Sequence, residues 1–325
     1  AEVPGTGATL GVDEVAGPRH AVERRSPLAS RGAIEAARTL AVLARAGVRG
    51  ADPDGWWALR EPTSTAPRVR DRDPVPVSPS GLVEFGHCQV RWLLGRLGGE
   101  GPPIGSAAIG TLVHEVLAEC DDADADILRM RLGDQWARLG LGDGWTGRAK
   151  RADAEAMLER AAAYFAAARR DGWVRIGAEV TMRHTLGRAV LTGVVDRLER
   201  APSGAVRVID YKTGSSKPKM SEVARHPQLG CYQVALEAGA FGAGVASGGA
   251  ALVQLGKAST RDITRAIQAQ PPLADDEDPR WASALVSDSA EAMAGARFAA
   301  TPGEWCRTCA VKGSCPVVPE GARLA

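Results

Sequence analysis

Two aspartates lie in the stretch 188–214, on two β-branched runs that are joined by a Pro-Ser-Gly turn. This pattern predicts a β-hairpin. Asp196 and Asp210 each lie seven residues from Ser203, so the hairpin would bring their carboxylates roughly opposite one another. Directly opposed like charges destabilise an antiparallel pair, and a bound cation would offset their repulsion. The spacing therefore predicts a metal site in the hairpin.

Lys212 follows Asp210 by two residues, and because side chains alternate along a strand, both should point to the same face. Two acids and an amine around one point would suit a metal ion and a phosphate. The competing interpretation places these residues where a hairpin meets solvent, as is usual for ionised side chains. Val206, Val208 and Ile209 argue against it, because they are apolar on both faces of the second strand. A carboxylate at the end of a buried strand needs a partner or a metal ion.

Three of the six cysteines, Cys306, Cys309 and Cys315, form a second cluster in a loop that contains Gly and Pro. Their spacing indicates that the thiolates bind a metal or a cluster. Three is an incomplete set, because zinc and iron–sulfur clusters usually take four protein ligands. Cys88, more than two hundred residues upstream, is the best candidate for the fourth ligand.

The other two cysteines, Cys120 and Cys231, lie within helical apolar patterns, and we expect them to be small buried residues. Structural zinc usually takes its ligands as two local pairs, whereas here three cysteines are local and one is distant. The spacing therefore favours an iron–sulfur cluster, with zinc as the alternative. The sequence shows no export signal, so we expect metal-bound or reduced thiols in place of disulfides.

Composition is that of a globular protein: 325 residues, 45% hydrophobic and 24% charged, enough for a sizeable core. The formal net charge of +1 excludes a global field that attracts nucleic acid, so such binding would use local clusters such as Arg148–Arg151 or Lys217–Lys219. No apolar run approaches the ~20 residues of a membrane span, which predicts a soluble protein. The first residue is alanine, so we expect the chain to be a piece of a longer one.

The sequence pattern predicts six helices: at about 30–47, 78–97, 149–170 and 227–238, one that begins near residue 104, and an Ala-rich one that ends at about Phe298. Strands are expected at 176–184 and 250–256, in addition to the hairpin. Residues 61–77 have the composition of a connector, so we place a domain boundary near residue 76, between segments 1–75 and 76–325. This order of elements indicates a mixed α/β domain.

His114 lies beside the apolar stripe of the predicted helix near residue 104, on a line with Gly110 and Ala118. The small neighbours leave room for a ligand, and histidine is a common metal ligand. The local sequence is equally compatible with a histidine on a helix surface. Gln228 and Tyr232 share a face of the later helix, and local sequence does not distinguish them from ordinary surface residues.

Together these residues resemble the RecB-like branch of the PD-(D/E)XK nuclease superfamily. Six segments match in the family's order, from residue 78 to residue 316: Ser78–Cys88, Gly110–Glu115, Gly193–Asp196, Val208–Gly214, Gln228–Tyr232 and the three-cysteine run. The resemblance implies a restriction-endonuclease-like α/β core, in which helices flank a central mixed sheet, preceded here by a helical segment. It further implies a set of ligands for Mg²⁺ or Mn²⁺: His114, Asp196, Asp210 and the Tyr211 carbonyl.

The same resemblance places Lys212 beside the attacked phosphate and makes Gln228 and Tyr232 supports of the site and the DNA. It also implies a [4Fe–4S] cluster on one distant and three local thiolates: Cys88, Cys306, Cys309 and Cys315. This is the iron-staple arrangement of AddB and the CRISPR-associated RecB-like exonucleases. There the cluster ties the C-terminal tail to the first helix of the domain and takes no part in cleavage.

The first 75 residues, with Trp56 and Trp57, look similar to the helicase-to-nuclease junction of AdnAB-type helicase–nucleases. The resemblance thus implies a Mg²⁺-dependent deoxyribonuclease, expected to be an exonuclease on single-stranded DNA ends. It would be the nuclease module of a helicase–nuclease in double-strand break repair, with DNA and a helicase motor as partners and a cytoplasmic, nucleoid-associated location. The alternative is a catalytically inactive nuclease-like module that binds DNA or acts as a scaffold.

Overall fold

The computed structural model describes residues 31–48, 51–53, 64–99, 105–120, 123–256 and 263–318, so Trp56 and Trp57 lie outside the described residues. The described residues belong to two compact units. The cysteine unit is drawn from Ala1–Asp73, Glu84–Gly101 and Glu291–Ala325, and the sheet unit from Pro74–Val83 and Pro102–Ala290. The domain boundary predicted near residue 76 stays a prediction.

A six-stranded mixed sheet forms the centre of the described sheet unit. Its strands are β1 (Val75–Val77), β2 (Val174–Leu186), β3 (Ala189–Arg200), β4 (Val206–Lys212), β5 (Ser247–Gln254) and β6 (Ile267–Gln270). β3 pairs antiparallel with β2 and β4 and parallel with the short β1. β4 then pairs parallel with β5, which pairs antiparallel with β6. The predicted mixed α/β architecture is confirmed.

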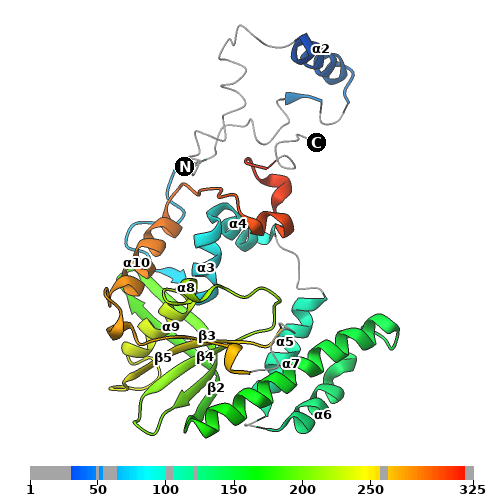
Figure 1. The fold of residues 1–325 in the computed structure, drawn as a ribbon. Helices are drawn as coiled ribbons and strands as arrows, with labels where there is room; N and C mark the ends of the chain where they lie inside the picture. The colour runs from blue at the N-terminus through cyan, green and yellow to red at the C-terminus, as the bar shows by residue number, and fades with distance from the viewer. Residues whose placement is uncertain are drawn as a thin grey trace, which may run out of the picture. The chain divides into compact units, whose positions relative to one another are not determined.

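Helices cover both faces of this sheet (Figure 1). They are α5 (Ser106–Glu119), α6 (Ala125–Gln135), α7 (Trp145–Arg170), α8 (Met220–Val223) and α9 (Pro227–Glu237). On one face, α5, α6 and α7 form a core with Ile209 and Tyr211 of β4 and Val253 of β5. Because side chains alternate along a strand, Asp210 and Lys212 of β4 point to the other face, where α9 lies.

The β3–β4 hairpin has the centre that the sequence predicts. Arg197 pairs with Ile209 and Arg200 with Val206, a register whose midpoint is Ser203. The pairing ends at Arg197 and Ile209, and one further step along the same register would set Asp196 opposite Asp210. β4 is buried from Val208 to Tyr211, so these carboxylates follow the interior part of the sheet, as expected from the apolar run.

α9 is buried along nearly its whole length, from Gln228 to Leu236. Pro227 lies in the first turn of α9. Backbone N–H groups there have no acceptor within the helix, so the N–H that proline lacks costs no hydrogen bond. At Gly230, an added Cβ would lie only 2.4 Å from the Trp281 ring of α10 (Trp281–Ala294). The helix that carries Gln228 and Tyr232 is therefore fixed closely by packing.

Some elements differ from the sequence prediction. The helix expected at 78–97 is broken into α3 (Pro79–His87) and α4 (Gln89–Leu94) by Cys88, whose backbone is extended (φ −162°, ψ 113°). Part of the predicted connector is β1, and part of the polar stretch after residue 258 is β6. β1 has three residues and β6 has four, which is too short for a hydrophobic periodicity to be recognised. The helix α6 was also not predicted.

Within the cysteine unit, aromatic contacts hold the region around α4. Trp92 is buried, with ring centroids 5.0 Å from Phe85 and 6.2 Å from Phe298. The Arg68 guanidinium lies 5.3 Å from the centre of the Trp92 ring, and its Nε donates to the Met293 carbonyl at 2.7 Å. The remaining helical elements of this unit include α2 (Arg31–Arg45), η3 (Gly95–Gly99), η7 (Glu304–Thr308) and η8 (Lys312–Ser314).

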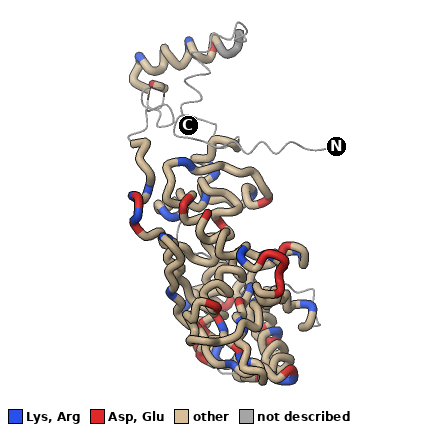
Figure 2. The backbone as a smooth tube through the Cα atoms, turned by 90° about the vertical axis from the view of Figure 1, so that its left-hand side faces the viewer, with Lys and Arg blue, Asp and Glu red and all other residues tan. Residues whose placement is uncertain are grey.

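Lys and Arg are interspersed with Asp and Glu along the backbone (Figure 2), consistent with a formal net charge of +1. Any attraction for a polyanion would therefore come from local arrangements of charge. Across the described ranges, no helix combines the length and the apolar character that crossing a membrane requires.

Leu158 of α7 is fully buried in the core beneath the sheet. We expect Leu158→Ala to lower the free energy of unfolding by about 2–5 kcal/mol, because it removes apolar contacts and leaves a cavity. The measurement is urea unfolding followed by circular dichroism. Met130→Ala, on the 64% exposed Met130 of α6, is the control and should change stability by less than about 0.5 kcal/mol. Equal effects of the two substitutions would contradict this core.

Candidate active site

Asp196 lies where the pairing between β3 and β4 ends. Beyond the Arg197–Ile209 pair, its Oδ2 accepts a hydrogen bond from the Tyr211 backbone N–H at 2.6 Å. The Asp196 carboxylate thus accepts a hydrogen bond that, within the sheet, a backbone carbonyl of β3 would accept. The Tyr211 side chain points to the opposite face, where its ring lies 6.3 Å from that of Tyr164 in an edge-on contact. The position of Asp196 is therefore tied to the core through β4.

Asp210 is only 4% exposed and is held from two sides. Its Oδ1 accepts hydrogen bonds from Gln228 Nε2 at 2.6 Å and from the Tyr232 hydroxyl at 3.1 Å. Its Oδ2 lies 2.7 Å from Lys212 Nζ. Lys212 Nζ also donates to Gln228 Oε1 at 2.7 Å, which fixes the orientation of the Gln228 amide. Four residues that the sequence singled out thus form one hydrogen-bonded group.

His114 reaches the same region from α5. A Cβ on Gly110, one turn earlier, would lie 2.7 Å from Thr213 Oγ1, so glycine there allows α5 to approach the end of β4. His114 Nδ1 lies 3.3 Å from Asp196 Oδ1, and its ring centroid lies 6.1 Å from that of Tyr211. From the local sequence, His114 could be a surface residue or a metal ligand. In the structure it lies against the carboxylate of Asp196.

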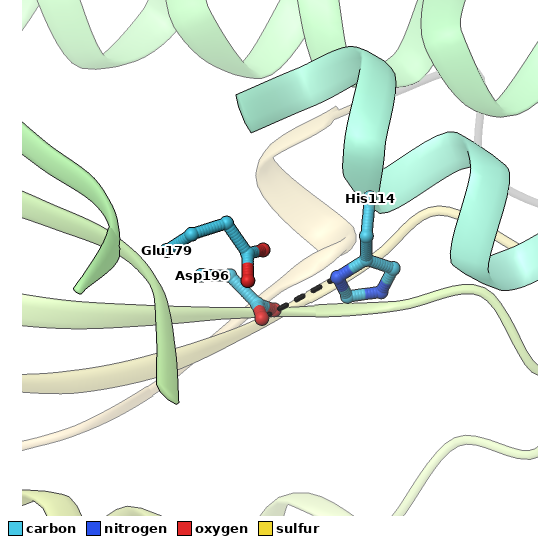
Figure 3. Close-up of side chains that lie close together, drawn as sticks. All are labelled: His114, Glu179 and Asp196. Atoms are coloured by element: carbon cyan, nitrogen blue, oxygen red, sulfur yellow. Dashed lines mark ion pairs between the residues drawn. The ribbon is translucent and has the colours of Figure 1, made fainter. Parts of the chain in front are cut away.

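Glu179 of β2 joins this group, although the sequence reasoning gave it no role. One nitrogen of His114 and one carboxylate oxygen each of Glu179 and Asp196 all lie within 4.8 Å of one another (Figure 3). Glu179 also has a positive φ of 47°, which is uncommon for a residue with a side chain. In the sequence, only its position between apolar residues of a predicted strand set Glu179 apart. Its neighbour in the site, Asp196, lies in another strand, β3, so the local sequence could not connect the two.

Burial and an excess of negative charge together shift the pKa values of the site residues. Burial, opposed by Lys212, raises the pKa of Asp210, and the charge of Asp196 adds to the rise. Burial and then the charge of Asp196 raise the pKa of Glu179. At His114 burial lowers the pKa, but the hydrogen bond and charge of Asp196, with the charges of Asp210 and Glu179, outweigh it and raise the pKa. A cation in the site would offset this charge.

The donor set fits a hard divalent cation. Carboxylate oxygens are the ligands that Mg²⁺ and Mn²⁺ prefer, and imidazole nitrogen is acceptable to Mn²⁺. Buried Asp210 Oδ2 has no hydrogen bond from the described residues besides its ion pair with Lys212, so it retains a lone pair for a ligand. The predicted role of the Tyr211 carbonyl stays a prediction.

A buried ionic network lies beneath the site on the α7 side of the sheet. Glu199 is fully buried and accepts from Arg197 Nε at 2.6 Å, from Arg207 Nε at 2.8 Å and from the Tyr164 hydroxyl at 2.7 Å. Arg197 is also stacked on Phe165, 4.7 Å from the ring centre. Since Arg197 follows Asp196 directly and Tyr164 contacts Tyr211, this network supports the strands on which the carboxylates lie.

The four cysteines predicted to act together line one pocket in the cysteine unit: Cys88, Cys306, Cys309 and Cys315. Cys88 lies at the break between α3 and α4, and Cys306 and Cys309 lie in and directly after η7. The Gly303 backbone N–H donates to Cys306 Sγ at 3.4 Å. Burial raises the pKa of the Cys315 thiol, and the nearby Cys88 and Cys306 thiols raise it further.

The remaining two cysteines lie outside this pocket, and the predicted burial is confirmed for Cys231. Cys231 is buried in α9, where desolvation raises the pKa of its thiol to about 12. Cys120 follows α5 and packs, partly buried, against the core of the sheet unit.

Comparison with known proteins found one family. The family model described as the PD-(D/E)XK nuclease superfamily matches residues 76–316, which is more than half of the chain. A search of curated proteins found no match.

We expect Tyr232→Phe to lower the free energy of unfolding by about 1–3 kcal/mol, because it removes one of the two hydrogen bonds to the buried Asp210 Oδ1. Urea unfolding in EDTA measures the change without interference from bound metal. An unfolding free energy equal to that of the wild type would show that this hydrogen bond does not hold Asp210 in solution.

Proposed function

Because the chain belongs to the PD-(D/E)XK nuclease superfamily, we propose that it is a metal-dependent deoxyribonuclease that hydrolyses phosphodiester bonds in DNA. One observation carries this proposal: Asp196, Asp210 and Lys212 converge at the end of the β3–β4 hairpin. His114 of α5 adjoins Asp196 at the same point. Two acids and an imidazole can hold a metal ion that assists hydrolysis of a phosphate ester, and an amine can offset charge on the phosphate.

In this proposal the cation is held by four groups: His114, Asp196, Asp210 and the Tyr211 carbonyl. A cation there would offset charge on the phosphoryl oxygens and help to deprotonate the attacking water. Gln228 and Tyr232 donate to Asp210 Oδ1 and so orient its other oxygen. Lys212, a third exposed, offers an ammonium that orients the water or offsets the charge that develops on the phosphate.

The finer assignment rests on the resemblance to the RecB-like branch. We propose an exonuclease on single-stranded DNA ends that forms the nuclease module of a helicase–nuclease in double-strand break repair. Its partners would then be DNA and a helicase motor, in the same chain or in another subunit. Labelled single-stranded and duplex substrates, with the label at either end, test the strand preference and the polarity.

Asp210→Ala and Lys212→Ala should each reduce Mg²⁺-dependent DNA cleavage by at least about 10³-fold, since each removes a group that acts on the reacting phosphate. The measurement is release of label from single-stranded DNA by the purified chain. EDTA should abolish cleavage by the wild type. Glu237→Ala, at the opposite end of α9 from Gln228, is the control and should cleave at the wild-type rate.

Cleavage by either site variant at the wild-type rate would overturn the assignment of these residues. Binding of DNA without cleavage by the wild type would favour the alternative, an inactive nuclease-like module. Circular dichroism of each variant separates loss of chemistry from loss of fold.

We also propose that the four cysteines of the common pocket hold a [4Fe–4S] cluster. Structural zinc usually takes its ligands as two local pairs, whereas here three cysteines are local and one is distant, which favours a cluster over a single zinc ion. The cluster would link Cys88 to residues more than two hundred positions later and so constrain the unfolded chain.

Cys309→Ser should remove the brown colour and the bound iron and lower the free energy of unfolding by about 2–5 kcal/mol, as does the loss of a cross-link that closes a long loop. Iron, sulfide and zinc analysis and urea unfolding measure these effects. Cys120→Ser, outside the pocket, is the matched control. A colourless wild type that contains one zinc ion per chain, or a Cys309→Ser variant as stable as the wild type, would contradict the proposal.

A further inference from the structure

Glu179 has a backbone conformation that a residue with a side chain rarely adopts. Its φ is +47°, and Glu179 and Arg72 are the non-glycine residues with positive φ in the part of the chain that the structure describes. The left-handed region places Cβ too close to the backbone and is populated mainly by glycine. A conformation of this kind persists where the surrounding structure holds it in place, and often at a functional site.

The pairing of β2 with β3 places Glu179 opposite Asp196. Ala178 pairs with Arg197 and Val180 with Val195, so the same register sets residues 179 and 196 across from each other. Two carboxylates directly opposed across an antiparallel pair repel one another. The arrangement is therefore unfavourable both in backbone conformation and in charge unless a positive group lies between the carboxylates.

The close-up view shows where these side chains meet. The carboxylate of Glu179 from β2, the carboxylate of Asp196 from β3 and the imidazole of His114 from α5 converge on one point (Figure 3). Their three donor atoms lie within 4.8 Å of one another. Ligands that are each about 2.0–2.6 Å from one ion lie at most about 4–5 Å apart, so this triangle has the size of one coordination sphere.

We propose that Glu179 is a further ligand of the divalent cation in this site and binds it together with Asp196 and His114. The inference rests on the proposed function, because it concerns the same cation. It brings a third strand into the centre: β2 supplies Glu179, β3 supplies Asp196 and β4 supplies Asp210. It also gives a reason for the positive φ at Glu179, whose carboxylate lies beside Asp196 and His114.

A purely structural role for residue 179 makes a different prediction. If the positive φ served only to bend β2, glycine would serve as well or better, and metal affinity would not depend on the carboxylate. As a ligand, Glu179 contributes the negative charge that glycine and glutamine lack.

The test is Mn²⁺ binding to the full chain without DNA, followed by the electron paramagnetic resonance signal of free Mn²⁺. Glu179→Gln keeps the shape of the side chain and should raise the Mn²⁺ dissociation constant at least about tenfold. Glu179→Gly should bind as weakly as Glu179→Gln, while its melting temperature in EDTA is equal to or above that of the wild type. Asp196→Asn should also lose affinity, and Glu237→Gln, at the far end of α9, should bind as the wild type does.

The outcomes for these variants distinguish the role of Glu179 from the proposed function. Wild-type affinity in Glu179→Gln together with weakened binding in Asp196→Asn would overturn the role of Glu179 and leave the proposed function standing. Wild-type affinity in both variants would overturn the metal site itself and this inference with it. Restoration of affinity by Glu179→Gly would show that the conformation matters and the carboxylate does not.

Discussion

The site depends on one electrostatic constraint: three carboxylates, Glu179, Asp196 and Asp210, are held near one another with little positive charge between them. Lys212 pairs with Asp210 and His114 with Asp196, and burial still raises the pKa of Asp210 and of Glu179. Such a group is stable only because the strands that carry it are secured elsewhere. The same tension makes the site receptive to a divalent cation, whose charge would replace repulsion with attraction.

The strands are held in place because one face of β4 packs in the core while its other face carries site residues. On β4, Ile209 and Tyr211 enter the core with α5 and α7, whereas Asp210 and Lys212 face α9. The buried ionic network of Glu199 with its two arginines lies on the packing face. Buried ion pairs contribute little net stability, but removal of one partner is costly, so a network of this kind favours one register. A slip of one residue would place every carboxylate on the wrong face.

Much of the fold and of the candidate site could be predicted from the sequence, because local rules determine it. The midpoint of the hairpin at Ser203 and the alternation of Asp210 with Lys212 follow from turn chemistry and strand geometry. Glu179 could not be found in this way, because its role depends on a pairing partner in another strand and on a backbone conformation. The break at Cys88 was also missed, since an apolar helical pattern continues through it while the residue itself is extended. Short strands such as β6 have too few residues to show an alternation of apolar and polar side chains.

The burial of α9 has a consequence for how the site responds to its ligands. Gln228 and Tyr232 sit on a helix that has nearly no exposed surface and that lies against Trp281 as closely as glycine permits. Their side chains therefore have little rotational freedom left to lose when a ligand arrives. The entropy of ordering this half of the site is lost during folding, before any encounter with substrate. Glu179, by contrast, lies at an exposed position of β2. The half of the centre that α9 supplies is thus ordered before the ion and the DNA strand arrive.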